Sequence, residues 1–354
     1  MRLISAVVAF AAFLPSTSLL ARAQDGRRPG ADVEARDQFD FWVGAWDIVN
    51  RRLQEDGSWQ EFPASAMIEE ALSGDAIVER WVSRTDAWPM RGFSMRMVDA
   101  KTGLWTIALC WPSPAGNTAK FSFMEGSLSD GRGAFFPRRD EGDDTPARVR
   151  FTFSEITETS LQWDQAVRTE DGDWHTTWIM EWTRRDADDP IDEAWLNGAA
   201  DEVRGAPGAR TLDWLVGDWV QSEGPGRGLS TIECDVLQSG FTLRFRHTQK
   251  FRAFADMRAD AQTGTVTMSE TDGLLAWDAN DGVWRYLEGE RGGEMRVYAG
   301  SLVGDTLTLT NGAGDIRMVL ARLENGQVRW RMERTVKGEW IGARESVYAR
   351  QDAP

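Results

Sequence analysis

The sequence predicts an all-β protein composed of two tandem antiparallel β-barrels, each introduced by a short helical turn. Apolar residues alternate with polar ones, as in RVRFTF at 148–153 and TLRFRH at 242–247, and a period of two is typical of half-buried strands. Turn dipeptides such as Asp-Gly at 56–57 and Asn-Gly at 325–326 recur roughly every 8–12 residues, as in the hairpins of a meander. About eight to ten strands in each half would close most economically into a barrel.

A long internal repeat divides the chain into two copies of one domain. Three short phrases return in the same order: FDFWVGAWD (39–47) as LDWLVGDWV (212–220), DAKTGLW (99–105) as DANDGVW (278–284), and GSL (126–128) as GSL (300–302). The repeated unit is about 150 residues long, which is too long for a solenoid repeat and long enough to bury its own core. We therefore expect each copy to fold as a whole domain.

The N-terminal segment over residues 1–23 has the features of a secretory signal peptide. Arg2 precedes an apolar run over 3–14, and the small-residue sequence Ala-Arg-Ala at 21–23 ends the segment. No other stretch approaches the roughly 20 apolar residues of a transmembrane helix, so we expect no membrane span. The sequence thus predicts an exported protein, either periplasmic or secreted.

Domain boundaries follow from the positions of the repeat. After an N-terminal linker over 24–36, we expect barrel 1 over 37–187, a linker with a short helix over 188–210, barrel 2 over 211–350 and a tail over 351–354. An Asp-Pro pair at 189–190 can begin the short helix.

Composition excludes several classes of partner and site. The chain carries a formal net charge of −16, so we expect no nucleic-acid partner. Cys110 and Cys234 lie in different copies and are predicted to be separate buried thiols. The chain has only 2 histidines, which leaves too few ligands for a zinc site of the usual kind. We therefore expect neither a metal site nor, as the main hypothesis, any cofactor.

Each copy opens with a helical spacing of apolar residues directly before a G-x-W motif. In the first copy Phe39, Trp42 and Val43 have the spacing of one helical turn, and Gly44 and Trp46 follow. A short turn of helix should therefore lead directly into the first strand.

These residues resemble the calycin superfamily of lipocalin-like barrels, and within it a bacterial family of exported lipocalin-like domains of unknown function. In such barrels a helical turn closes one end, the glycine admits the first strand, and an arginine late in the last strand covers the tryptophan. The resemblance implies that six residues close the two barrels: Gly44, Trp46 and Arg184 in the first copy, and Gly217, Trp219 and Arg350 in the second.

Strand parity predicts which side chains enter each lumen. In the second copy the inward face carries His247, and alignment of the copies places Glu79 and Trp81 on that face in the first copy, with Glu70 on the neighbouring strand. The opposite parity carries two repeated acid–base pairs that we interpret as cross-strand surface ion pairs: Glu69 with Arg80, and Glu233 with Arg246.

The last strand of each copy permits two parities. In the first copy, one parity directs His175 and Glu181 inward, whereas the other directs the tryptophans at 174, 178 and 182 inward. We expect the first parity, which would also direct Glu345 into the second lumen.

The preferred function is binding of a small hydrophobic molecule, mainly in barrel 1. The chain has 18 tryptophans, most of them in the first copy, and a lumen lined by aromatic and methionine side chains can leave an adaptable apolar pocket. The predicted ligand-binding residues are Glu70, Glu79, Trp81, Phe93, Met95 and His175 in barrel 1 and His247 in barrel 2.

Three alternatives stay open. The first is an enzyme acting on a hydrophobic substrate, because carotenoid hydratases and some cyclases resemble tandem or fused barrels; Glu70, Glu79 and His175 would then serve as acid and base, or Cys234, His247 and Glu345 as nucleophile, base and orienting group. The second is a haem bound through His175, as in barrels of the nitrobindin type. The third is an envelope scaffold with filled barrels. Binding is preferred over catalysis.

Overall fold

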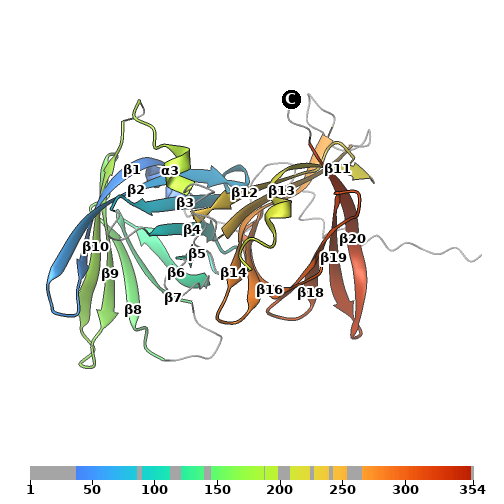
Figure 1. Cartoon of the computed structure of the whole chain (residues 1–354). Coiled ribbons are helices and arrows are strands. Elements are labelled where there is room, and N and C mark those ends of the chain that lie inside the picture. Colours follow the sequence, from blue (N-terminus) through green and yellow to red (C-terminus); the bar gives the residue numbers. More distant parts are fainter. Residues whose placement is uncertain are drawn as a thin grey trace, which may run out of the picture.

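The computed structural model contains two closed antiparallel barrels of ten strands each, side by side (Figure 1). It describes residues 37–85, 90–111, 121–138, 145–186, 188–197, 208–223, 227–238, 242–252 and 265–351. The predicted signal peptide over 1–23, the linker over 24–36 and most of the C-terminal tail lie outside the described residues. The predicted fold class is confirmed.

Barrel 1 is an up-and-down meander in which each strand pairs with the next and the last returns to the first. It begins with a 3-10 turn, η1 (Asp40–Trp42). Its strands are β1 (Gly44–Leu53), β2 (Trp59–Ala71), β3 (Ala76–Ser83), β4 (Arg91–Val98), β5 (Trp105–Cys110), β6 (Phe121–Ser129), β7 (Arg132–Pro137), β8 (Val149–Ser154), β9 (Ser160–Arg168) and β10 (Trp174–Arg184), with a second 3-10 turn, η2 (Leu72–Gly74), between β2 and β3.

Barrel 2 repeats this arrangement, again after a 3-10 turn, η3 (Asp213–Leu215). Its strands are β11 (Gly217–Glu223), β12 (Thr231–Leu237), β13 (Thr242–Arg252), β14 (Thr265–Asp278), β15 (Val283–Glu290), β16 (Glu294–Val303), β17 (Thr306–Asn311), β18 (Ile316–Arg322), β19 (Val328–Val336) and β20 (Glu339–Arg350).

Between the barrels, a short helix, α3 (Glu193–Asn197), packs on the outside of barrel 1. Leu196 and Ile191 form a small apolar cluster with Val82 of β3. Within the described ranges, no helix has the length and apolar content needed to cross a membrane.

The repeated D-x-x-x-G phrases form equivalent hairpin turns. The Asp99 carboxylate accepts hydrogen bonds from the backbone N–H groups of Lys101 and Thr102 at 2.7 and 3.2 Å, between β4 and β5. Asp278 does the same between β14 and β15 for the two residues at 280 and 281. The side chain thus caps the turn and explains why this phrase occurs in both copies.

The G-x-W glycine allows an arginine to cover the end of each barrel. Trp46 is fully buried, its indole N–H donates to the Trp42 carbonyl oxygen at 2.7 Å, and the Arg184 guanidinium carbon lies 4.3 Å from its ring centroid. Gly44 has φ +131°, and a Cβ there would lie 2.5 Å from Arg184 Nη1. Only glycine therefore accommodates both the backbone and the guanidinium.

Barrel 2 has the same closure. The Arg350 guanidinium carbon lies 4.8 Å from the Trp219 ring centroid, and Gly217 has φ +123° with a hypothetical Cβ 2.6 Å from Arg350 Nη1. In both barrels the tryptophan and the arginine are register partners on the first and last strands.

A third apolar cluster joins the two barrels and corrects one sequence-based prediction. Phe93 and Met95, which we predicted in the lumen of barrel 1, instead pack outward from β4 against residues of barrel 2 such as Leu274 and Leu287. The cluster is tight, since a Cβ at Gly289 of β15 would lie 2.5 Å from Met95 Sδ. Strand β4 is therefore buried on both faces.

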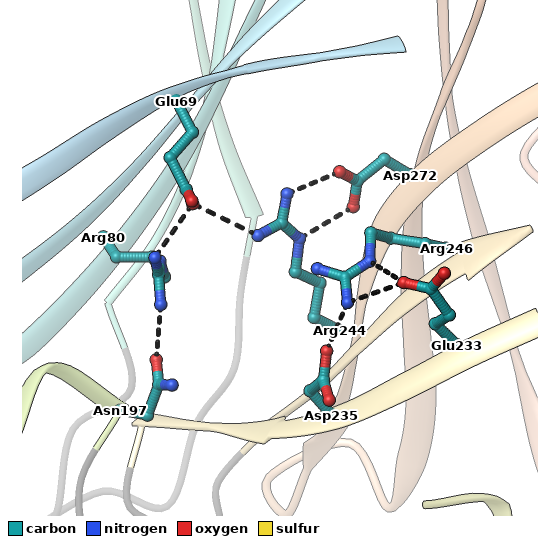
Figure 2. A network of polar contacts seen from close by, with 8 residues as sticks. All are labelled: Glu69, Arg80, Asn197, Glu233, Asp235, Arg244, Arg246 and Asp272. Carbon is teal, nitrogen blue, oxygen red and sulfur yellow. Dashed lines mark hydrogen bonds and ion pairs between the residues drawn. The ribbon is translucent and has the colours of Figure 1, made fainter. Parts of the chain in front are cut away.

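Buried ion pairs border this junction (Figure 2). Arg244 of β13 makes two hydrogen bonds to Asp272 of β14, at 2.7 and 3.1 Å, and lies 3.5 Å from Glu69 of barrel 1. Glu69 also contacts Arg80 at 2.9 Å, and Arg80 donates to Asn197 of α3 at 3.1 Å. The predicted Glu69–Arg80 pair thus forms, but at the junction between barrels rather than on an open surface.

The parity we expected for the last strands is wrong. In β10, the side chains that enter the core are those of Trp178, Met180 and Trp182, whereas His175 and Glu181 are exposed. Burial of two indoles and a methionine stabilises the barrel more than burial of a carboxylate and an imidazole would. In β20, Tyr348 is buried in the core and Glu345 is exposed.

Candidate functional site

Barrel 1 encloses a cavity of about 330 Å³. Side chains from η1 and from eight of the ten strands line it, so it lies in the lumen. Its wall is largely aromatic and includes Trp42, Phe151, Phe153, Trp163, Trp178 and Trp182. This volume is at the lower end of the roughly 300–1,000 Å³ of ligand pockets in proteins.

A buried ion pair lies in the wall of this cavity near the closed end. Glu79 of β3 accepts a hydrogen bond from the Ser94 hydroxyl at 2.6 Å, and Arg96 Nη2 lies 3.5 Å from the same carboxylate oxygen. Ser94 and Arg96 belong to β4, and register pairing of Glu79 with Ser94 puts all three side chains on the inward face. The guanidinium carbon of Arg96 also lies 3.4 Å from the Trp42 ring centroid.

Burial acts on both charges of this pair. It raises the pKa of Glu79, an effect that Arg96 and the Ser94 hydroxyl oppose. It lowers the pKa of Arg96 to about 9, and Glu79 opposes this shift. Burial therefore disfavours the charged form of each group, and the opposite charge of its partner favours it.

The far end of the cavity is aromatic. The rings of Trp111 and Trp178 have centroids 6.1 Å apart, and Arg52 lies over Trp178 at 5.2 Å. The Trp178 indole N–H donates to the buried Asn50 side chain at 3.1 Å. The ring of Trp81, which we predicted on the same inward face as Glu79, has its centroid 5.2 Å from that of Trp111. The cavity thus has an ion pair at its closed end, and aromatic rings with one arginine, Arg52, at its far end.

Barrel 2 replaces every member of the polar cluster with a smaller or apolar residue. Strand register makes Phe245 the counterpart of Glu79, Gly273 that of Ser94 and Leu275 that of Arg96. The repeated phrase before G-x-W makes Leu215 the counterpart of Trp42. The fold therefore forms with an apolar cluster at this place, and the charged cluster is a particular property of barrel 1.

The structure separates the predicted acid–base residues of barrel 1. Glu79 lines the cavity, whereas Glu70 is exposed at the end of β2 and His175 is exposed on β10. The three groups therefore do not converge on one site. His175, the axial ligand expected for a haem, is likewise exposed and is not among the residues that line the cavity.

In barrel 2, His247 lies in the lumen, as strand parity predicted. Its Nε2 is 2.7 Å from the Tyr348 hydroxyl and 3.1 Å from the Gln249 amide nitrogen, and its ring packs on Trp330. Burial, with a smaller effect of Arg344, lowers the pKa of His247 to about 3. The imidazole is therefore neutral and structural.

The alternative set of Cys234, His247 and Glu345 does not converge either. Cys234 is buried, and burial raises the pKa of its thiol well above the ordinary range. Glu345 is exposed on the outer face of β20, with its carboxylate 3.8 Å from Arg329. A thiol that stays protonated and lacks the orienting carboxylate is a packing group.

Another buried carboxylate in barrel 2 was not predicted. Glu288 accepts a hydrogen bond from the Tyr298 hydroxyl at 3.2 Å, and burial is the main cause that raises its pKa to about 7. It follows Trp284 and Tyr286 on the inward parity of β15, so parity alone could have identified it.

Arg96 was also missed, although the sequence contained a signal for it. Opposed residues on neighbouring antiparallel strands share one face of the sheet. Once Glu79 is directed inward, pairing of β3 with β4 directs Ser94 and Arg96 inward and Met95 outward. The apolar character of the methionine-rich face concealed this, since it is buried by barrel 2 rather than by the lumen.

Comparison with known proteins leaves the family open. No family model matches the chain, and no curated protein matches it. Among solved structures, Rv2717c from M. tuberculosis is 10% identical, with 44% of this chain and 100% of that chain covered and a TM-score of 0.32. An S-type phycobiliprotein lyase from Guillardia theta is 11% identical, with 42% and 91% covered and a TM-score of 0.25.

A DUF3598-family protein of unknown function from Nostoc punctiforme is 12% identical, with 90% of this chain and 99% of that chain covered and a TM-score of 0.21. Similarity at this level assigns no function. The two ten-stranded barrels themselves fit a calycin-like fold, and membership of the bacterial exported family stays a prediction.

Proposed function

We propose that this protein is an exported binding protein for a small apolar molecule, which it holds in the lumen of barrel 1. The observation that carries the proposal is the cavity of about 330 Å³, which has a largely aromatic wall and one ion pair at its closed end. Ligand pockets typically combine such an apolar wall with few polar groups, which orient the ligand. Export rests on the signal-like sequence over 1–23.

The aromatic side chains favour a flat or elongated apolar ligand. Trp163 and Trp178 present rings at 89° to each other with centroids 5.8 Å apart, and both line the cavity. A ligand packed against these rings gains dispersion contacts on its faces and edges, and it displaces water from apolar surface. The proposal therefore specifies an apolar body of modest size.

The test is native mass spectrometry of protein purified from the periplasmic fraction of its own organism, to detect a co-purified small molecule. Leu109 lines the cavity, so Leu109→Trp would fill part of it, and Leu109→Met would keep its volume as a control. We expect the wild type and Leu109→Met to retain an apolar molecule and Leu109→Trp to lose it. Equal retention in all three proteins would contradict a site in barrel 1.

A further inference from the structure

We propose that the ligand of barrel 1 carries one acidic oxygen group, such as a carboxylate or sulfonate, and that this group binds Arg96 at the closed end of the cavity. The inference rests on the proposed function, because it specifies the chemistry of the molecule held in that cavity. It adds the orientation of the ligand, with its charged group near η1 and its apolar body toward the tryptophans of the far end.

The hydrogen-bonding inventory of Arg96 is incomplete. A guanidinium has five N–H donors and no acceptor. The side chain is only 3% exposed and lines the cavity, and its Nη2 makes the 3.5 Å contact with Glu79. Its Nε and Nη1 are buried without a hydrogen-bond partner among the described residues. Buried donors without acceptors are costly, so an acceptor in the cavity would stabilise them.

Two indole N–H donors that line the same cavity also lack a hydrogen-bond acceptor. The indole nitrogens of Trp42 and Trp182 are likewise buried without a partner in the described part of the chain, and both residues line the cavity. An indole nitrogen only donates. The carboxylate of Glu79 already accepts from Ser94 and Arg96. The closed end therefore has more donors than acceptors, and an ionised carboxylate, which accepts up to about four hydrogen bonds, matches that surplus.

The loose geometry of the ion pair leaves room for a competing anion. A charge-assisted N–H···O bond is usually about 2.7–2.9 Å long, whereas the Arg96–Glu79 contact is 3.5 Å. Because burial raises the pKa of Glu79, this carboxyl can take up a proton when a ligand anion arrives. The cluster then keeps one positive and one negative charge, the latter on the ligand.

The second barrel shows that the fold does not need this charge. Its counterparts of Arg96, Glu79 and Trp42 are Leu275, Phe245 and Leu215, all buried in its core. A buried ion pair is often no more stabilising than apolar residues of similar volume. A role in ligand binding explains why barrel 1 contains the Glu79–Arg96 ion pair and barrel 2 does not.

Two fluorescent probes with the same aromatic rings test the inference: 1-anilinonaphthalene-8-sulfonate, which is an anion, and N-phenyl-1-naphthylamine, which lacks the sulfonate. The full chain is titrated with each probe. We expect the wild type to bind both, and Leu109→Trp to weaken both. We expect Glu79→Gln, which removes the competing carboxylate, to bind the sulfonate at least threefold more tightly and the neutral probe unchanged.

The double variant Glu79→Gln with Arg96→Leu isolates the guanidinium without leaving an unpaired buried charge, and it introduces the leucine found at the same register in barrel 2. Relative to Glu79→Gln alone, it should bind the sulfonate at least tenfold more weakly and the neutral probe within about threefold. Thermal melting checks that both variants fold. Unchanged sulfonate affinity in the double variant overturns the inference and leaves the proposed function intact. If the wild type binds neither probe, both proposals fail.

Discussion

At the scale of single residues, barrel closure depends on how closely an arginine approaches a glycine. Arg184 Nη1 donates to the Val43 carbonyl oxygen at 2.7 Å and its Nε donates to the Glu158 carbonyl oxygen at 2.7 Å. The guanidinium thereby joins the chain before β1 to the loop before β9 while it covers Trp46. A side chain at Gly44 would displace it from all of these partners.

Gly44→Ala should therefore destabilise the protein by about 1–3 kcal/mol, through an unfavourable φ and a displaced guanidinium. Gly57→Ala is a matched control, because Gly57 also has a positive φ, +84°, but has nothing within 4 Å of a hypothetical Cβ. Urea unfolding measures the difference. Equal losses in the two variants would assign the effect to the backbone alone.

His247 should make stability depend on pH. Its pKa is about 3 in the folded protein because of burial, against about 6.5 in an unfolded chain. Between these values the unfolded chain binds an extra proton at this imidazole, so the contribution of His247 lowers stability as the pH decreases from 6.5 toward 3, by up to about 1.4 kcal/mol per pH unit. His247→Gln should remove this contribution and so change the slope of stability against pH, measured by urea unfolding at pH 7 and pH 5, toward relatively greater stability at pH 5. His175→Gln, at an exposed histidine, should leave the slope as in the wild type.

At the scale of elements, strand β4 shows what sequence patterns could and could not predict. Alternation correctly predicted its existence, and every residue after Arg91 is buried. A period of two assigns residues to two faces but does not say which face meets the lumen when both faces are covered. The alternation of Phe93, Met95 and Met97 reads as a lumen face, and only the neighbouring barrel makes it an outer one.

The inward face of the last strands was predicted wrongly for a different reason. In β10 a register shift lies between Thr176 and Trp178, so the strand changes its pairing partway along. A bulge of this kind has no reliable signature in a single sequence, and parity counted from the wrong side of it is inverted. The position of Arg184 at the end of β10 was predicted correctly, because the repeated G-x-W motif indicated that an arginine late in the last strand covers Trp46.

Strand β13 carries two arginines with different expected contributions. Arg244→Met should destabilise the protein by about 3–5 kcal/mol, because it leaves Asp272, which is 3% exposed, without its cation. Arg246→Met is the control: Arg246 contacts Glu233 at 3.0 Å and Asp235 at 2.6 Å on the open surface, and its loss should cost about 1 kcal/mol or less. Both arginines are drawn with their partners in Figure 2, and calorimetry compares the stabilities of the two variants. Similar losses would show that Arg244 is no more important than a surface residue.

At the scale of the whole molecule, duplication was readable in the sequence, whereas the contact between the copies was not. The repeated motifs lie at the turns and closed ends, where each barrel needs them for itself. The junction instead uses residues that differ between the copies, such as Met95 on one side and Gly289 on the other. Interactions across such a surface depend on shape, and shape is not encoded in the order of motifs.

Strands β3 to β5 form a shared wall, with the cavity on one side and barrel 2 on the other. Glu79 and Arg96 project from its inner face, and Met95 and Met97 from the outer face. Because both faces of this wall are packed, its strands have little freedom to separate from one another. Elsewhere in barrel 1, β7 and β8 share, among the strands described, just three register pairs, Gly133 with Phe153 to Phe135 with Phe151, fewer than any other neighbouring strands of this barrel. We expect a ligand to enter between β7 and β8, where the fewest register pairs hold neighbouring strands together, rather than through the wall that barrel 2 covers. The second barrel would thus limit where a ligand can enter the first.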